Sequence, residues 1–162
     1  MAAISQARSA QIKSLNTDKD ISIKECINEL VFIINSMCNK NKKDGDIQEI
    51  RDGFMVAKGE NPVAIIMNAG PYFWKYRTHI ERGDVNSLLN MEYKEEISEV
   101  QESLADNSKF EKISVVMQKV KRTWHLLTPT EQETMKKKFK LILIKYTGYL
   151  VACKKLKDLG CL

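Results

Sequence analysis

The sequence predicts an all-α protein, a single compact domain of about six helices around a buried C-terminal helix. Glycine and proline are scarce, with 7 Gly and 3 Pro in 162 residues, so few positions favour the turns that connect short strands. Apolar residues recur at steps of three and four along most of the chain, which is the spacing of one helical face. Three stretches also carry the Ser/Thr-x-x-Glu pattern of a helical capping box.

The C-terminal stretch is the predicted centre of this fold. Thr128 and Glu131 have capping-box spacing, and Pro129 stands at the first helical position, where its missing N–H is not needed. One face of the helix that follows is apolar from Met135 to Leu156. The opposite face carries three further aliphatic residues: Leu141, Ile144 and Val151. A helix that is apolar all round is typically buried, so we expect this helix to be enclosed by the others.

At the other end of the chain, residues 1–20 are polar and are predicted to form an N-terminal arm, either mobile or docked as a short helix. Residues 21–162 are then the all-helical domain. Ser22 and Glu25 form the second capping-box pattern, and a largely buried helix is expected from there to about Met37. The polar segment 39–45, rich in asparagine and lysine, is predicted to be a solvated loop.

Proline positions organise the middle of the chain. Asn61 followed by Pro62 predicts a helix start, with a capping side chain and then proline at the first position. Gly70 and Pro71 should break or kink that helix, because an internal proline removes one backbone hydrogen bond and crowds the preceding turn. A separate helical piece is therefore expected over residues 72–80.

The segment 92–106 is strongly acidic, with six acidic residues against one lysine. Its apolar residues fall at helical steps, so we expect an exposed amphipathic helix. Ser108 and Glu111 form the third capping-box pattern, and a stripe of apolar residues at steps of three and four continues from there to Leu127. The sequence predicts another amphipathic helix over this stretch.

Two groups of residues are candidates for binding. Residues 129–162 carry eight lysines against three acidic residues, so this segment alone has a balance of +5, which equals the net charge of the whole chain. An aromatic run at 72–76 is interleaved with cations, an arrangement that can stack bases, hold phosphates or form a protein interface. The alternative is a solvated lysine face and an aromatic run that packs inward. The candidate residues are Lys136, Lys137, Lys140, Lys154, Lys155, Trp74, Lys75 and Arg77.

No motif in the sequence indicates a reaction. His79 and His125 are the only histidines, and neither has an orienting partner close by in the sequence. The four cysteines form no C-x-x-C pair, which favours free thiols in a reducing compartment over disulfides or zinc. No apolar run is long enough to span a membrane. We expect an intracellular protein, cytoplasmic or nuclear, that is not an enzyme and uses no cofactor and no metal.

Two stretches carry a resemblance to a known group of proteins. The first is the run from Gly70 to Arg77, Gly-Pro-Tyr-Phe-Trp-Lys-Tyr-Arg, with Ile80 and Asp84 after it. The second is the run 124–131, Trp-His-Leu-Leu-Thr-Pro-Thr-Glu, continuing into 139–143. Together they cover about a quarter of the chain, and they resemble small helical proteins of nucleocytoplasmic large DNA viruses. The resemblance implies a virion component or an infected-cell protein, and it carries over no functional residue.

The sequence therefore favours a non-enzymatic helical protein that acts through a protein partner or through self-association. The rival interpretation is a nucleic-acid-associated protein that uses the lysine-rich face of the last helix together with Lys75 and Arg77. The complementary signs of the acidic segment 92–106 and of that lysine face favour association guided by charge.

Overall fold

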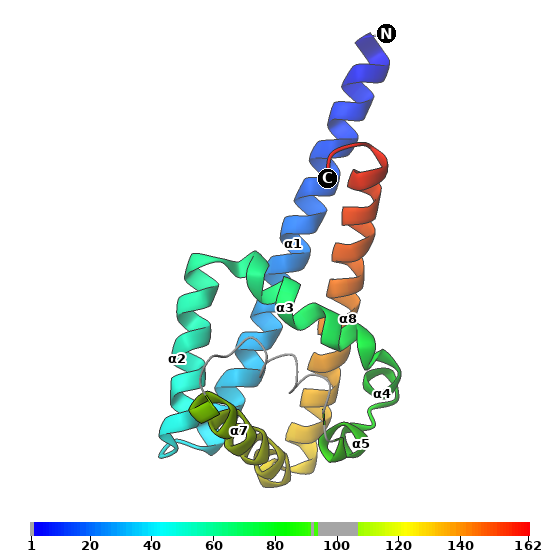
Figure 1. Ribbon diagram of the computed structural model, residues 1–162. Helices are drawn as coiled ribbons and strands as arrows, with labels where there is room; N and C mark the ends of the chain where they lie inside the picture. Colours follow the sequence, from blue (N-terminus) through cyan, green and yellow to red (C-terminus); the bar gives the residue numbers. More distant parts are fainter. Residues whose placement is uncertain (1, 92, 94–106) are drawn as a thin grey trace.

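The computed structural model describes residues 2–91, 93 and 107–162, and over these ranges the chain is all-α (Figure 1). Its helices are α1 (Ala2–Lys40), α2 (Gly45–Glu60), α3 (Pro62–Lys75), α4 (Arg77–Arg82), α5 (Val85–Asn90), α7 (Asn107–Leu126) and α8 (Pro129–Asp158). The predicted fold class is confirmed. The acidic segment 92–106, which we predicted to be an amphipathic helix, lies outside the described residues apart from Tyr93.

Two long antiparallel helices, α1 and α8, are the central elements of the fold. In Figure 1, α1 and α8 run side by side, and the first turns of α1 extend beyond the end of α8. The pair is held together along its length: Lys40 Nζ lies 2.8 Å from Glu131 Oε1 at one end. At the other end, the Arg8 guanidinium donates to the Leu159 carbonyl over 2.6 Å. The remaining helices lie across and beside this pair.

The core forms two clusters along α8. Where α1, α3 and α8 meet, the buried residues are Ile23, Cys26, Ile27, Ile66, Tyr146 and Tyr149. Where α5, α7 and the start of α8 meet, they are Val85, Trp124, Leu127 and Met135, with Phe139 partly buried against them. The predicted apolar face of the C-terminal helix therefore supplies both clusters. Its capping box is confirmed, since Thr128 and Glu131 bond to each other's backbone N–H.

One half of the prediction for the C-terminal helix is wrong. We expected this helix to be buried all round, but the face turned away from the core is open. Leu141, Ile144 and Val151 are 37%, 61% and 47% exposed. The physical reason is that α1 and α3 cover only one side of α8, and among the described residues nothing is packed over the other side.

Two predicted helix boundaries are also wrong. Ser22 does not start a helix, because α1 runs unbroken from Ala2 to Lys40 and includes the predicted N-terminal arm. Gly70 and Pro71 do not end one, because α3 continues through Pro71 to Lys75, and the break comes at Tyr76. Packing explains the second case, since α3 lies so close to α8 at Gly70 that a Cβ there would be 2.1 Å from the Tyr146 ring.

Candidate functional site

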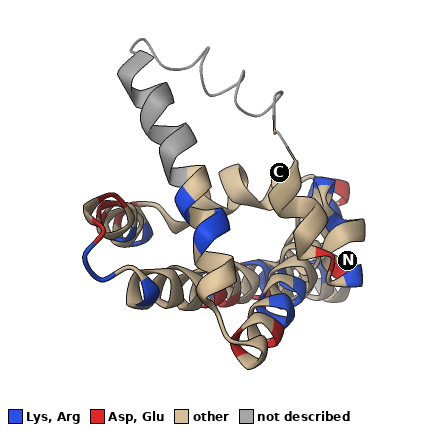
Figure 2. Ribbon diagram, turned by 90° about the horizontal axis from the view of Figure 1, so that it is seen from below, with Lys and Arg blue, Asp and Glu red and all other residues tan. Residues whose placement is uncertain are grey.

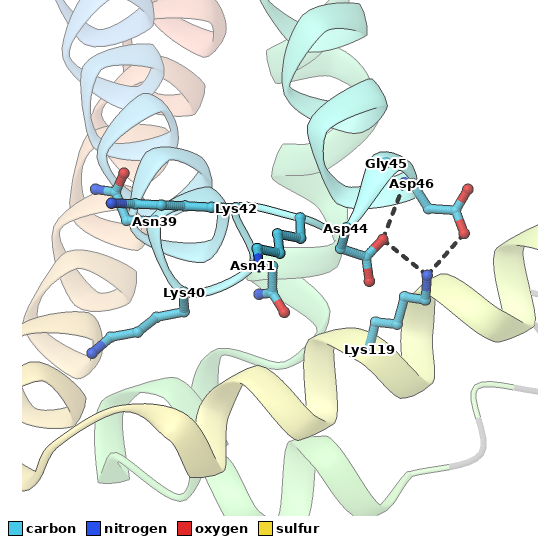
Figure 3. A pocket seen from close by; sticks show the side chains of 9 residues that line it. Asn39, Lys40, Asn41, Lys42, Asp44, Gly45, Asp46 and Lys119 are labelled. Carbon is cyan, nitrogen blue, oxygen red and sulfur yellow. Dashed lines mark hydrogen bonds and ion pairs between the residues drawn. The ribbon is translucent and has the colours of Figure 1, made fainter.

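The loop between α1 and α2 forms an open polar hollow lined by several lysines and asparagines (Figure 3). Lys119 reaches into it from α7 and donates to Asp44 Oδ1 and Asp46 Oδ2, each over 2.9 Å. Asp44 also caps α2 by accepting from the backbone N–H groups of Asp46 and Ile47. The two carboxylates pair with Lys119, and Asp44 occupies the N-terminus of α2, while Lys42 and Lys43 also line the hollow.

The charges in this hollow stabilise one another. The hydrogen bond from Lys119 is the main cause that lowers the pKa of Asp44 below its ordinary value, with help from the backbone N–H of Ile47. In the reverse direction, Asp46 and Asp44 raise the pKa of Lys119. This cluster joins the α1–α2 loop to α7. Its geometry indicates a structural contact rather than a reactive site.

Because the folded pKa of Asp44 is lowered, its contribution to stability is present above the ordinary carboxyl pKa of about 3.9 and is lost as the pH falls through the folded value. We expect Lys119→Met to reduce this loss, so that the melting temperature of the variant depends less on pH as the pH falls below about 4. Thermal unfolding followed by circular dichroism across this range measures the effect. Parallel curves for variant and wild type would contradict it.

Most side chains of the aromatic run at the α3–α4 junction contact other residues of the protein. The Arg77 guanidinium lies 4.4 Å from the centre of the Trp74 ring and donates to the Trp74 carbonyl. Lys75 Nζ lies 5.4 Å from the centre of the Tyr76 ring. Phe73 faces inward, with its ring centre 6.4 Å from that of Phe139. Trp74 and Tyr72 remain 42% and 39% exposed, so these two rings of the run could meet a partner.

Seven of the eight lysines of α8 fall into two groups, and the eighth, Lys157, is exposed near the end of the helix. Lys136 pairs with Glu133 on the same helix over 3.0 Å. Two others pair with α1: Lys138 Nζ lies 2.8 Å from Glu29 Oε2, and Lys145 Nζ lies 2.7 Å from Glu25 Oε2. Lys138 also lies over the ring of Phe32, 4.6 Å from its centre. These three lysines serve the fold, and Lys136 is thereby a weaker binding candidate than we predicted.

The second group borders the open side of α8. Lys137, Lys140, Lys154 and Lys155 are exposed, and none of the four has an acidic partner among the described residues. They stand at the two ends of the strip formed by Leu141, Ile144 and Val151. We call these seven residues, with Gly148 in the middle, the outer face of α8. This face combines an apolar centre with basic ends.

The described residues offer little to a reaction. No group of three or more His, Cys, Asp or Glu side chains among them could hold a metal ion. The cysteines are free: Cys26 and Cys38 are buried, and burial raises the pKa of Cys26 to about 11, which disfavours its reactive thiolate. A search of the described helices finds none that is long and apolar enough to cross a membrane.

Fold and site together define an all-α protein with an amphipathic outer face on its last described helix. No family model, curated protein or solved structure matches this chain.

Proposed function

We propose that this protein is a non-enzymatic interaction protein that binds a protein partner through the outer face of α8. The observation that carries the proposal is the combination of three exposed aliphatic side chains with four lysines that have no acidic partner among the described residues. Contiguous exposed apolar surface rimmed by polar residues marks interaction sites, whereas apolar side chains exposed singly are ordinary. The bordering charges would guide the approach of a partner and set its orientation.

Stability alone does not account for this face. Exposed ion pairs contribute only about 0–1 kcal/mol each, and these four lysines form none with the described acids. Ile144 and Val151 leave about half of their apolar surface in water, whereas full burial would stabilise by roughly 25 cal/mol per Å² of apolar area. Both features become favourable when another molecule covers the face.

Nucleic-acid binding is the second candidate, supported by the same lysines. Two observations weigh against it. Lys140 and Lys154 are separated by about 21 Å of helix at 1.5 Å per residue, and the strip between them is aliphatic. Figure 2 shows both blue and red segments on the helices seen from this side. A phosphate backbone would have to cross the strip without a cation to contact.

We expect that Lys137→Glu, Lys140→Glu and Lys155→Glu, made together, weaken the association with the partner at least tenfold and leave the melting temperature within a few degrees of wild type. The physical reason is that these charges lie in solvent and lack internal partners among the described residues. A photo-crosslinking amino acid at position 144 captures the partner, mass spectrometry identifies it, and the yield is compared between the variant and wild type.

The matched control reverses Lys58, an exposed lysine of α2, and should leave crosslinking unchanged. A triple variant that crosslinks like wild type would contradict the proposal, and so would capture of nucleic acid in place of protein. The resemblance to proteins of large DNA viruses extends the proposal to a virion or infected-cell component. Detection of the protein in purified virus particles, against infected-cell extract, tests that extension.

A further inference from the structure

We infer that the partner segment that covers the outer face of α8 is an acidic amphipathic helix lying lengthwise along α8. This inference rests on the proposed function and gives the partner its chemistry. It is carried by three features of the face: its shape, a glycine that no close internal contact explains, and lysines without an acidic partner among the described residues.

The shape of the face fits a helix. Lys137, Leu141, Ile144, Gly148, Val151 and Lys155 follow one another in steps of four, three, four, three and four, so they lie in one straight line along α8. From Lys137 to Lys155 the line spans about 27 Å, the length of roughly 18 residues of a second helix. The backbone groups inside α8 bond within the helix, so an extended strand would find no open edge to pair with. A helix needs only side-chain contacts, and packed helices meet through such rows.

Gly148 stands in the middle of this line and has no internal reason to be glycine. A Cβ added there would meet only the Ser22 hydroxyl, at an ordinary contact distance of 3.5 Å. Gly70 differs, because a Cβ there would overlap the Tyr146 ring. Glycine weakens the interior of a helix relative to alanine, so a surface glycine without an internal role is a local cost. Without a Cβ at this position, a partner's side chain or backbone can approach the axis of α8 closely.

The charge of the face selects an acidic partner. Each end of the apolar strip carries two lysines without an acidic partner among the described residues. A helix with an apolar ridge and flanking Glu or Asp would neutralise both ends while covering the strip. A second copy of the same face fails this requirement, because in either orientation the lysines of one copy would meet lysines of the other.

An anionic membrane surface fits less well than a helix. The neighbouring edge of α1 carries Glu25 and Glu29, whose ion pairs with α8 place acids beside the strip. Because these carboxylates pair with Lys138 and Lys145, the two lysines add no net positive charge that would attract an anionic bilayer. The strip itself is purely aliphatic, without the Trp or Phe that interfacial helices commonly place at headgroup depth. A partner helix avoids both difficulties, since it covers only the narrow line along α8.

The test uses the full chain, labelled with ¹⁵N, and a synthetic 18-residue helical peptide with Leu at steps of three and four and Glu on both flanks. We expect amide shift changes concentrated at residues 137–155 and an affinity that falls as salt is raised. Ile144→Ser, and separately Lys137→Glu with Lys155→Glu, should each weaken binding at least tenfold. Gly148→Leu should do the same, whereas Lys58→Glu on α2 should have no effect. A matched peptide with Lys in place of Glu should not bind.

The same experiment also tests whether something other than an acidic helix covers the outer face. Equal binding of wild type and outer-face variants, or shift changes elsewhere, would overturn the inference. So would preferential binding to phosphatidylserine vesicles or to a 20-nucleotide single strand, or a dimer in sedimentation that the Lys137 and Lys155 reversals dissociate. If the peptide fails but crosslinking at position 144 still captures a protein partner, the acidic helix is wrong and the proposed function survives. If crosslinking at position 144 captures nothing as well, both fail.

Discussion

Replacing Ile142 with alanine is expected to lower the free energy of unfolding by about 2–5 kcal/mol, a large part of the 5–15 kcal/mol that typical domains possess. Ile142 is 2% exposed, and its carbonyl accepts from the Cys26 thiol of α1, so the side chain belongs to the α1–α8 contact. Two long helices paired along their length cannot easily collapse around one missing side chain. The lost burial and the remaining cavity both add to the cost. Unfolding in urea, extrapolated linearly to water, measures it.

The matched control is Ile144→Ala, two positions further along the same helix. Ile144 is 61% exposed, so the same truncation should change the free energy of unfolding by no more than about 0.5 kcal/mol. Equal costs for the two variants would mean that the outer face is buried in the free protein. In that case its exposed aliphatic strip, and the proposal built on it, would both be wrong.

These two isoleucines also show how far the sequence could predict the fold. Helical period, scarce glycine and proline, and the cap at Thr128 were enough for the all-α class and for the inner face of α8. Hydrophobicity alone could not show that Ile142 is buried and Ile144 exposed. A helix that is apolar on all sides can be a central helix, or it can have one buried face and one binding face. The regular line of positions from Lys137 to Lys155 was the available signal, and we read its aliphatic members as core.

Helix boundaries were predictable where the signal is local. Asn61 and Asp84 cap α3 and α5 through their own side chains, as their neighbours in sequence suggest. The same kind of pattern failed at Ser22, because a residue inside a helix has its backbone N–H bonded already and a capping side chain is not needed. The break predicted at Pro71 also did not occur, because contact between α3 and α8 outweighs the lost hydrogen bond.

The candidate site was predictable in part. The sequence identified the lysine-rich helix and the aromatic run, and both contain exposed side chains. It could not say which lysines are engaged, since the acids that pair with Lys138 and Lys145 lie on α1, more than 100 positions away in the sequence. Long-range ion pairs depend on the packing of α1 against α8, which no local spacing encodes. Of the five lysines of α8 predicted as candidates, only Lys136 is paired, with Glu133 on the same helix, and the other four lie on the outer face.

Gly70→Ala is the second substitution with a large expected effect. Alanine would ordinarily strengthen the helix by roughly 0.8–1 kcal/mol. At Gly70, however, the new methyl would lie 2.1–2.5 Å from three atoms of the Tyr146 ring, and that ring is itself buried against Tyr149. Overfilling a packed core typically costs about 1–3 kcal/mol, so we expect a net loss of stability and a lower melting temperature. The close contact also explains why α3 holds its helical course past Pro71.

Gly148→Ala is the matched control, because it makes the same change in a helix interior without the overlap. The nearest atom to a new Cβ is the Ser22 hydroxyl at 3.5 Å, so the substitution should stabilise by about 0.4–1 kcal/mol. Opposite signs for the two glycines, measured by urea unfolding under one set of conditions, would establish that Gly70 is required by internal packing and Gly148 is not. A neutral Gly70→Ala would contradict the close approach of α3 to α8. A destabilising Gly148→Ala would give Gly148 an internal role and remove one of the three features behind the acidic-helix partner.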